Sequence, residues 1–291
     1  MTTLVTPARV AVLGQGYVGL PLAMKAVAAG HDVVGIDAST ERVKRLAAGD
    51  SFVEDVPRVA LEAALRGAFQ GWRPGAEATE LPAKASETLQ LALVDSPDAP
   101  QSSVRMAVPV PDPASALYFQ TTLTNSLLGG TFGSRITSNI REDKGYSYSP
   151  DSSISAHRGG ALWVLSAEIT AEHTAAALTE IFKEIERLQR EAPAESELSP
   201  VKNYRAGIFV ISNSSPNGVL GQLAFMSLHG LPDDFLTHWV ANVQAVTPAQ
   251  VTEIARTFIR PERMTVVVAG DLAKIGGSVR ALPQFAGIRM P

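Results

Sequence analysis

A glycine-rich stretch near the N-terminus has the residue types and spacing of a phosphate-binding turn. Gly14-Gln15-Gly16-Tyr17-Val18-Gly19 follows a short apolar run, residues 9–13, and precedes helix-forming residues 20–29. In such a turn the first glycine permits the tight bend, the second lets the backbone approach a pyrophosphate, and the third lets the helix pack on the strand. The candidate cofactor-binding residues are therefore Gly14, Gly16 and Gly19.

An acidic residue completes this pattern. Asp37 lies 23 residues after Gly14, at the end of a second expected strand, where a carboxylate can accept hydrogen bonds from a ribose hydroxyl. Its charge disfavours a 2′-phosphate, so the pattern predicts NAD rather than NADP. Ser39 or Thr40 is expected to cap a second helix. The alternative is that the glycines serve only the fold, because half a dinucleotide-binding domain buries only part of a dinucleotide.

This opening resembles the start of UDP-sugar 6-dehydrogenases. The matching stretches are residues 14–23, 34–37 and 51–56. In that family, oxidation uses a catalytic cysteine much further along the chain, and this chain has no cysteine. The resemblance also ends near residue 66, before the rest of the cofactor domain and the sugar domain. We therefore do not expect dehydrogenase activity.

Composition excludes several classes of protein. The chain has 291 residues, of which 45% are hydrophobic and 19% charged, as in ordinary globular proteins. A net charge of -4 provides no basic field for nucleic acid. The sequence shows no secretory signal pattern and no apolar run of about 20 residues that could span a membrane. A cytoplasmic location is the default expectation, with the periplasm also open.

From about residue 67 to residue 271 the chain resembles a different family, the C-terminal, non-zinc domain of insulinase-like (pitrilysin-type) metallopeptidases. The matching stretches are residues 71–72, 93–97, 100–102, 127–130, 132–135, 140–148, 230–234, 245–248 and 267–271. This resemblance implies a twisted, antiparallel-rich sheet with helices on one face. The expected fold is therefore α/β, with a Rossmann-like βαβ fragment over residues 1–66 and an α+β peptidase-family domain over 67–291.

Catalytic members of that family bind zinc through an inverted motif, H-x-x-E-H, which places two histidines on one helix face. The histidines here are His31, His157, His173, His229 and His238. No two are four residues apart, and none stands in that motif. We therefore expect no zinc site and no peptidase activity from this chain alone.

The resemblance implies a different role for an arginine and a tyrosine seven residues apart, which reach the substrate backbone and the oxyanion near the zinc of the other half. Arg141 and Tyr148 match this spacing. A guanidinium and a phenol are hydrogen-bond donors suited to a carbonyl that gains negative charge. Tyr146 competes with Tyr148, because both fall on one face of the expected strand. The alternative is that Arg141 pairs with a nearby acid and Tyr148 fills a sheet face.

Local patterns predict the elements around these residues. Leu89, Leu91 and Leu93 alternate as in a strand, with residues 103–110 as its expected partner. A helix opening at Pro113 should stop at Gly129-Gly130, and the loop 129–133 resembles a shortened glycine-rich loop of non-catalytic processing-peptidase subunits, although a simple helix stop is the favoured interpretation. Strands are expected over 146–156, 161–169 and 264–268. A strong amphipathic pattern runs over 178–188, and Pro200 should break or restart the following helix.

Three hypotheses follow. The first is a non-catalytic peptidase-family protein that binds peptide, or complements a zinc-bearing partner subunit, through Arg141 and Tyr148. The second is an NAD-binding regulatory or vestigial dehydrogenase-like module. The third is a chimera with no selected joint function. A homo-oligomer is also plausible, because a single peptidase-like half leaves open the face that normally meets its mate.

Overall fold

The computed structural model describes residues 9–51, 63–64, 66–68, 70–71, 73, 75 and 84–288. The chain divides into two compact units, Met1–Thr79 with Val210–Ala224, and Glu80–Phe209 with Phe225–Pro291. Each unit contains one of the two sheets. Residues 52–56 and Trp72, which carry part of the resemblances, lie outside the described residues.

The first unit contains the expected βαβ fragment followed by a helix. Strands β1 (Arg9–Leu13) and β2 (Asp32–Ile36) are parallel, and α1 (Gly19–Ala28) connects them. Helix α2 (Thr40–Ala47) begins after Ser39, whose side chain accepts a hydrogen bond from the backbone N–H of Arg42. The prediction of a Rossmann-like start is confirmed, because strand, glycine turn, helix and second strand follow in the expected order.

The second unit is built on a five-stranded sheet. Its strands are β3 (Gln90–Asp95), β4 (Gln101–Val110), β5 (Asp151–His157), β6 (Gly160–Thr170) and β7 (Thr265–Gly270). Their order is β3-β7-β4-β6-β5, and only the β3–β7 pair is parallel. The expectation of an antiparallel-rich sheet is therefore confirmed.

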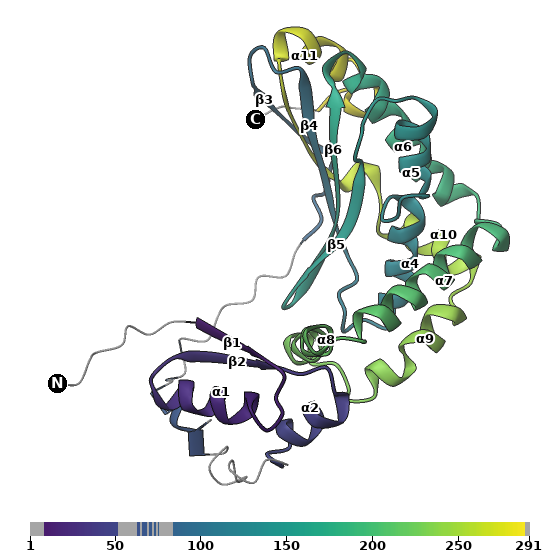
Figure 1. Cartoon of the computed structure of the whole chain (residues 1–291). Helices are drawn as coiled ribbons and strands as arrows, with labels where there is room; N and C mark the ends of the chain where they lie inside the picture. Colours follow the sequence, from purple (N-terminus) through teal and green to yellow (C-terminus); the bar gives the residue numbers. More distant parts are fainter. Residues whose placement is uncertain are drawn as a thin grey trace. The chain divides into compact units, whose positions relative to one another are not determined.

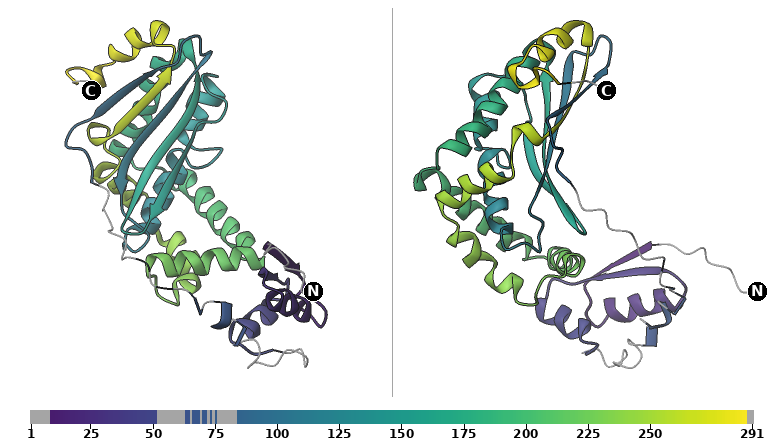
Figure 2. Two further views of the ribbon diagram at one scale, coloured as in Figure 1. Left: turned by 90° about the vertical axis from the view of Figure 1, so that its left-hand side faces the viewer. Right: turned by 180° about the vertical axis from the view of Figure 1, so that it is seen from behind.

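Helices cover one face of this sheet, as the views in Figures 1 and 2 show. Helices α7 (Glu195–Ser212) and α8 (Pro216–His229) fall partly in the first unit, which includes Val210–Ala224. The helical elements that fall wholly in the second unit are α4 (Tyr118–Leu128), α5 (Arg135–Thr137), the π-helix η1 (Ser138–Asp143), η2 (Ala171–His173), α6 (Thr174–Arg190), α9 (Phe235–Ala245), α10 (Pro248–Thr257), η3 (Pro261–Arg263), α11 (Leu272–Arg280) and η4 (Pro283–Phe285). Among the described helices, none combines the length and the apolar character needed to cross a bilayer.

The core lies between the sheet and these helices, as the alternation of buried residues in the strands requires. In β4 every second side chain from Ser102 to Val110 is buried, and Trp163 and Leu165 of β6 are fully buried beside them. The apolar stripe of α6 packs onto this face. Its fully buried members are Leu178, Ile181, Phe182, Ile185 and Leu188, which confirms the amphipathic pattern.

Strand pairing differs from the sequence prediction at one position. Residues 103–110 belong to β4, but β4 pairs with β6 and β7 rather than with β3. The C-terminal strand β7 lies between β3 and β4. The prediction that consecutive strands pair was wrong because a strand about 170 residues further along, itself expected from the sequence, is inserted between them.

Two prolines behave differently from each other. Strand β5 begins only at Asp151, after Pro150, so the strand expected from Tyr146 was predicted too long; Ser147 makes a single isolated bridge to Ile169. Pro150 has no N–H to donate to a ladder. Pro200, by contrast, lies inside an unbroken α7. It comes only five residues after the helix begins, where one missing hydrogen bond does not end the helix.

Candidate functional site

Arg141 is presented by an unusual helix. The three residues of α5 run directly into η1, a π-helix that spans Ser138–Asp143. π-helical turns are rare and occur often at functional sites. The Arg141 side chain is partly exposed, and its Nε lies 3.1 Å from a carboxylate oxygen of Glu142. The turn therefore places a guanidinium at the surface of the unit with one neighbouring acid.

Two aromatic rings lie against this guanidinium. The Cζ of Arg141 is 4.4 Å from the ring centroid of Phe132 and 4.9 Å from that of Tyr148. Cation–π contacts at exposed positions are worth about 0.5–1 kcal/mol each. The structure thus brings together the two residues that the seven-residue spacing selected, and adds Phe132 to them.

Tyr146 occupies a different environment. Its ring stacks on that of His173, with centroids 4.5 Å apart, and packs against the core. Tyr148, by contrast, is 79% exposed. The two tyrosines do not share a strand face, because strand β5 begins after both of them. The alternative that Tyr148 fills a sheet face does not hold, whereas Arg141 does pair with a nearby acid.

The segment that carries Tyr148 is tied to the helix that carries Arg141. The backbone N–H groups of Tyr146 and Ser147 both donate to the carbonyl of Ile140, at 2.8 and 3.3 Å. The Ser147 hydroxyl donates to the carbonyl of Glu168 at 2.7 Å. These contacts hold the two residues before Tyr148 against the residue before Arg141.

A cavity of about 410 Å³ lies beside the pair. It is lined by Gln101, Arg141, Glu142, Gly145, Tyr146, Ser147, Tyr148 and Thr170. The guanidinium offers several N–H donors and the phenol one O–H donor. Chemically, this arrangement suits a backbone carbonyl of an extended peptide, or the more negative oxygen that the carbonyl becomes during hydrolysis.

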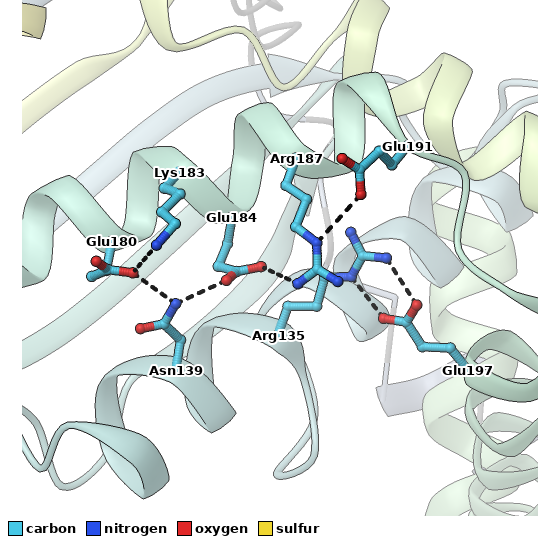
Figure 3. Close-up of polar contacts among 8 residues, drawn as sticks. All are labelled: Arg135, Asn139, Glu180, Lys183, Glu184, Arg187, Glu191 and Glu197. Carbon is cyan, nitrogen blue, oxygen red and sulfur yellow. Dashed lines mark hydrogen bonds and ion pairs between the residues drawn. The ribbon is translucent and has the colours of Figure 1, made fainter.

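Polar contacts anchor the α5–η1 helix to its neighbours (Figure 3). Arg135 donates from Nε and Nη2 to the two carboxylate oxygens of Glu197 on α7, at 2.7 and 2.8 Å. The hydrogen bond from Arg135 lowers the pKa of Glu197, although partial burial opposes this shift. The same pairing raises the pKa of Arg135. Both groups therefore remain charged over the physiological range.

Asn139 supplies a second anchor, two residues before Arg141. Its amide nitrogen donates to Glu180 at 2.9 Å and to Glu184 at 2.8 Å, both on α6 (Figure 3). Burial raises the pKa of Glu180, but the hydrogen bonds from Asn139 and Lys183 outweigh it and lower that pKa. Glu184 also pairs with Arg187 at 3.5 Å. These hydrogen bonds hold the first turn of the π-helix against α6.

The glycines after α4 are required by packing as well as by the helix stop. Gly129 caps α4, as expected. A Cβ on Gly129 would lie 2.5 Å from the Ser152 hydroxyl, and one on Gly130 would lie 2.4 Å from the Asn125 amide nitrogen. Asn125 and Ser152 are themselves hydrogen-bonded, at 2.8 and 3.2 Å. Only glycine lets the chain pass this close to them.

Sequence reasoning missed Phe132, Arg135 and Asn139 as parts of this site. The sequence prediction includes Phe132 only as a member of the loop 129–133 and of the matching stretch 132–135. Its place in a short glycine-rich loop was a usable signal. An aromatic residue there does not belong to the buried face of a helix or strand, so a role in binding is the remaining explanation. Arg135 and Asn139 gave no such signal, since their partners lie 41–62 residues away.

The glycine turn of the first unit has the expected geometry. Gly14 has a positive φ of 83°, which favours glycine. A Cβ on Gly19 would lie 1.6 Å from the carbonyl oxygen of Gly14, so this glycine allows the close helix–strand approach. Around Gly16 no atom lies within 4 Å of where a Cβ would be. The backbone at Gly16 is therefore open to a ligand.

Asp37 is buried and its carboxylate is already hydrogen-bonded. It accepts from the backbone N–H of Gln15 and of Ser39, and from the guanidinium of Arg42 at 2.9 and 3.1 Å. Burial raises the pKa of Asp37, but these hydrogen bonds outweigh it and hold the pKa below its ordinary value. A ribose hydroxyl would have to share this carboxylate with Arg42.

In the part of the chain that the structure describes, no group of three or more His, Asp or Glu side chains is arranged to hold a metal ion. The absence of zinc from the complete chain stays a prediction from the sequence.

Two families of known proteins match this chain in sequence. The model described as the peptidase M16 inactive domain matches residues 51–204, and that of the UDP-glucose/GDP-mannose dehydrogenase family, NAD binding domain, matches residues 8–76. The two matches overlap over residues 51–76. A search of curated proteins found no match.

Solved structures share the fold. The peptidase M16 inactive domain from Pseudomonas fluorescens has a TM-score of 0.64 and 23% identity, covering 82% of this chain and 53% of its own. A protease from Helicobacter pylori has a TM-score of 0.64 and 16% identity, covering 72% and 51%. A chain of complex III2 from Candida albicans, with Inz-5 bound, has a TM-score of 0.57 and 16% identity, covering 79% and 56%.

This chain spans about half the length of each of these three structures. At such identities they show the fold alone. The family itself is shown by sequence, because the first match extends over more than half of the 291 residues. The chain belongs to the peptidase M16 inactive domain family, and it begins with a segment similar to the NAD-binding domain of UDP-sugar dehydrogenases.

Proposed function

We propose that this chain binds extended peptide through Arg141 and Tyr148 and complements a zinc-bearing peptidase subunit. The observation that carries the proposal is the contact between these two side chains, with 4.9 Å from the Arg141 Cζ to the Tyr148 ring, beside a cavity of about 410 Å³. The carbonyl of Arg141 accepts a hydrogen bond from the Gly145 N–H at 3.1 Å, and the two residues before Tyr148 donate to the carbonyl of Ile140. A donor pair fixed before substrate arrives loses little entropy on binding.

The chemical role follows from the donors. In peptide hydrolysis the attacked carbonyl gains negative charge, and donors already in place stabilise that charge at little reorganisation cost. Arg141 and Tyr148 would supply such donors, while the activated water would come from the zinc of the other subunit. Removal of one such donor costs about 10²–10³ in kcat in other enzymes.

A partner belongs to the same proposal, because the sequence contains no H-x-x-E-H motif. A zinc-bearing peptidase subunit would supply the metal, and a second copy of this chain is the alternative partner. The division into residues 1–66 and 67–291 belongs to the same proposal, with the second part as the peptide-binding domain.

The test is a peptidase assay on a labelled digest of casein, with this chain, with a co-purifying H-x-x-E-H protein, and with both. We expect cleavage only in the mixture, and a loss of at least about a hundredfold in kcat for Arg141→Ala. The control variant is Arg190→Ala, whose side chain is exposed on α6. Equal turnover with wild-type and Arg141→Ala protein would reject the site assignment.

A second candidate function is NAD binding by the first unit, and the open backbone at Gly16 favours it. The direct measurement is calorimetry with NAD, in which micromolar binding should be lost in Asp37→Ala. If neither peptide nor NAD binds, the third hypothesis, a chimera with no selected joint function, remains.

A further inference from the structure

Phe132 is an exposed aromatic residue at a fixed position. Its side chain is 68% exposed, yet the loop that carries it is anchored on both sides. The Thr131 hydroxyl donates to the carbonyl of Ser126 at 3.0 Å, and the Ser134 N–H donates to the carbonyl of Thr131 at 3.0 Å. Just before Phe132, Gly129 and Gly130 pack tightly against the side chains of Ser152 and Asn125. The ring is therefore exposed although its loop is well held.

Phe132 and Tyr148 expose their rings around one guanidinium. Both residues are more than two-thirds exposed, and both ring centroids lie within 5 Å of the Arg141 Cζ. The free energy falls when another apolar group covers the apolar surface of a ring that is exposed to water. The Nε of Arg141 forms an ion pair with Glu142. Its Nη groups can donate hydrogen bonds to a carbonyl oxygen of a bound peptide.

We propose that Phe132 and Tyr148 form a subsite for an apolar side chain of the bound peptide, next to the carbonyl that Arg141 holds. This inference rests on the proposed function, and it adds the side-chain class that the site selects. A basic side chain gains little from the two rings, because the Arg141 guanidinium already lies against both of them. The Arg141–Glu142 ion pair carries no net charge, so it attracts neither an acidic nor a basic side chain. Aliphatic and aromatic side chains remain as the favoured class.

The experiment measures binding to the full chain by fluorescence anisotropy. The probes are short, fluorescein-labelled, end-blocked peptides of alanine and glycine with one central phenylalanine, leucine, serine or lysine. With wild-type protein we expect the phenylalanine and leucine peptides to bind about tenfold more tightly than the serine and lysine peptides. Phe132→Ala should remove this preference, so that the phenylalanine and leucine peptides lose more affinity than the serine and lysine peptides do.

Two conservative variants separate the subsite from a general structural role. Phe132→Tyr should keep the preference, because the ring remains. Phe132→Leu should keep part of the apolar contact but lose the ring–guanidinium contact. Because the side chain is exposed, Phe132→Tyr should leave the urea midpoint of unfolding unchanged, and Phe132→Leu should lower it only slightly, through the lost ring–guanidinium contact. A Phe132→Ala protein that weakens all four peptides equally, or none, would overturn the subsite.

The failure of this inference is distinguishable from the failure of the proposed function. If Arg141→Ala abolishes binding but Phe132→Ala leaves the peptide preference intact, only the subsite is wrong. If no peptide binds to wild-type protein, or if Arg141→Ala binds as wild type does, the proposed function fails and the subsite fails with it.

Discussion

Arg135 and Glu197 form two parallel hydrogen bonds, of 2.7 and 2.8 Å, although 62 positions separate them in the sequence. The guanidinium is almost completely buried, whereas the carboxylate is about one-third exposed. The pair joins the start of the helix that carries Arg141 to α7 (Figure 3). Planar, bidentate pairing of this kind fixes orientation as well as distance.

Removing the charge of Glu197 should destabilise the second unit. Glu197→Gln leaves the buried guanidinium of Arg135 without a counter-charge, and we expect a loss of about 2 kcal/mol in the free energy of unfolding. Urea titration followed by tryptophan fluorescence measures it. The matched control is Glu186→Gln, which removes an exposed pair with Arg190 at 3.9 Å and should cost less than about 0.5 kcal/mol. Equal losses in the two variants would contradict a special role for the buried pair.

The same carboxylate should make stability depend on acid. The pKa of Glu197 is lowered in the folded protein, so its pairing stabilises fully above the ordinary pKa of 4.5 and is lost as pH falls through the lowered value. The stability difference between wild type and Glu197→Gln should therefore be largest at neutral pH and should shrink at about pH 3.5. Urea titrations of both proteins at the two pH values provide the test. A difference that does not change with pH would show that the pairing is not linked to protonation.

The loop that presents Phe132 should not tolerate a side chain at Gly130. A Cβ there would lie 2.4 Å from the Asn125 amide nitrogen and 3.1 Å from the Ser152 carbonyl oxygen. We expect Gly130→Ala to cost about 1–3 kcal/mol and to weaken peptide binding by displacing the loop. Gly133→Ala is the control, because nothing lies within 4 Å of its Cβ position. Thermal unfolding measures the stability of the two variants, and fluorescence anisotropy measures their peptide affinity. Equal stability and equal peptide affinity of Gly130→Ala and Gly133→Ala would contradict the prediction.

Two glycines of the N-terminal turn should separate folding from ligand binding. Gly19→Ala places a Cβ 1.6 Å from the Gly14 carbonyl oxygen, and we expect a loss of at least about 2 kcal/mol. Gly16→Ala meets no atom within 4 Å and should leave the fold intact. Hydrogen exchange of the backbone amides in β1 and β2 measures the stability of this fragment in both variants. If Gly16→Ala loses NAD binding while its exchange rates stay unchanged, the substitution has removed a ligand contact and not the fold.

Much of the fold could be predicted from local patterns, because local physics decides those elements. The stripe from Leu178 to Leu188 could only bury itself as a helix. Thr247 with Gln250 forms a capping box at the start of α10, a pattern that four consecutive residues specify. The position of β7 between β3 and β4 could not be derived in this way. Strand order depends on contacts between residues far apart in sequence, and no local pattern specifies them.

Some features of the candidate site could likewise be predicted from the sequence, and others could not. The seven-residue spacing of Arg141 and Tyr148 is visible in the sequence. No sequence pattern indicated the two backbone hydrogen bonds to the Ile140 carbonyl that bring the segment of Tyr148 next to Arg141. Tyr146 and Tyr148 could not be separated because the sequence suggested one continuous strand. The hydrogen bonds that occupy Asp37 were equally hidden, since they depend on how Arg42 folds back from α2.

The π-helix Ser138–Asp143 makes the position of the Arg141 guanidinium depend on chain length and not only on residue type. Successive residues of a helix are rotated by about 100° around its axis. Deleting Ser138, which lies between Arg135 and Arg141, would let the turn relax to ordinary α-helix and would rotate the guanidinium away from both rings. Every residue that touches peptide would still be present, and the pairing of Arg135 with Glu197 would be intact. A single-codon deletion in that turn would therefore disable this chain although its contact residues all read as unchanged.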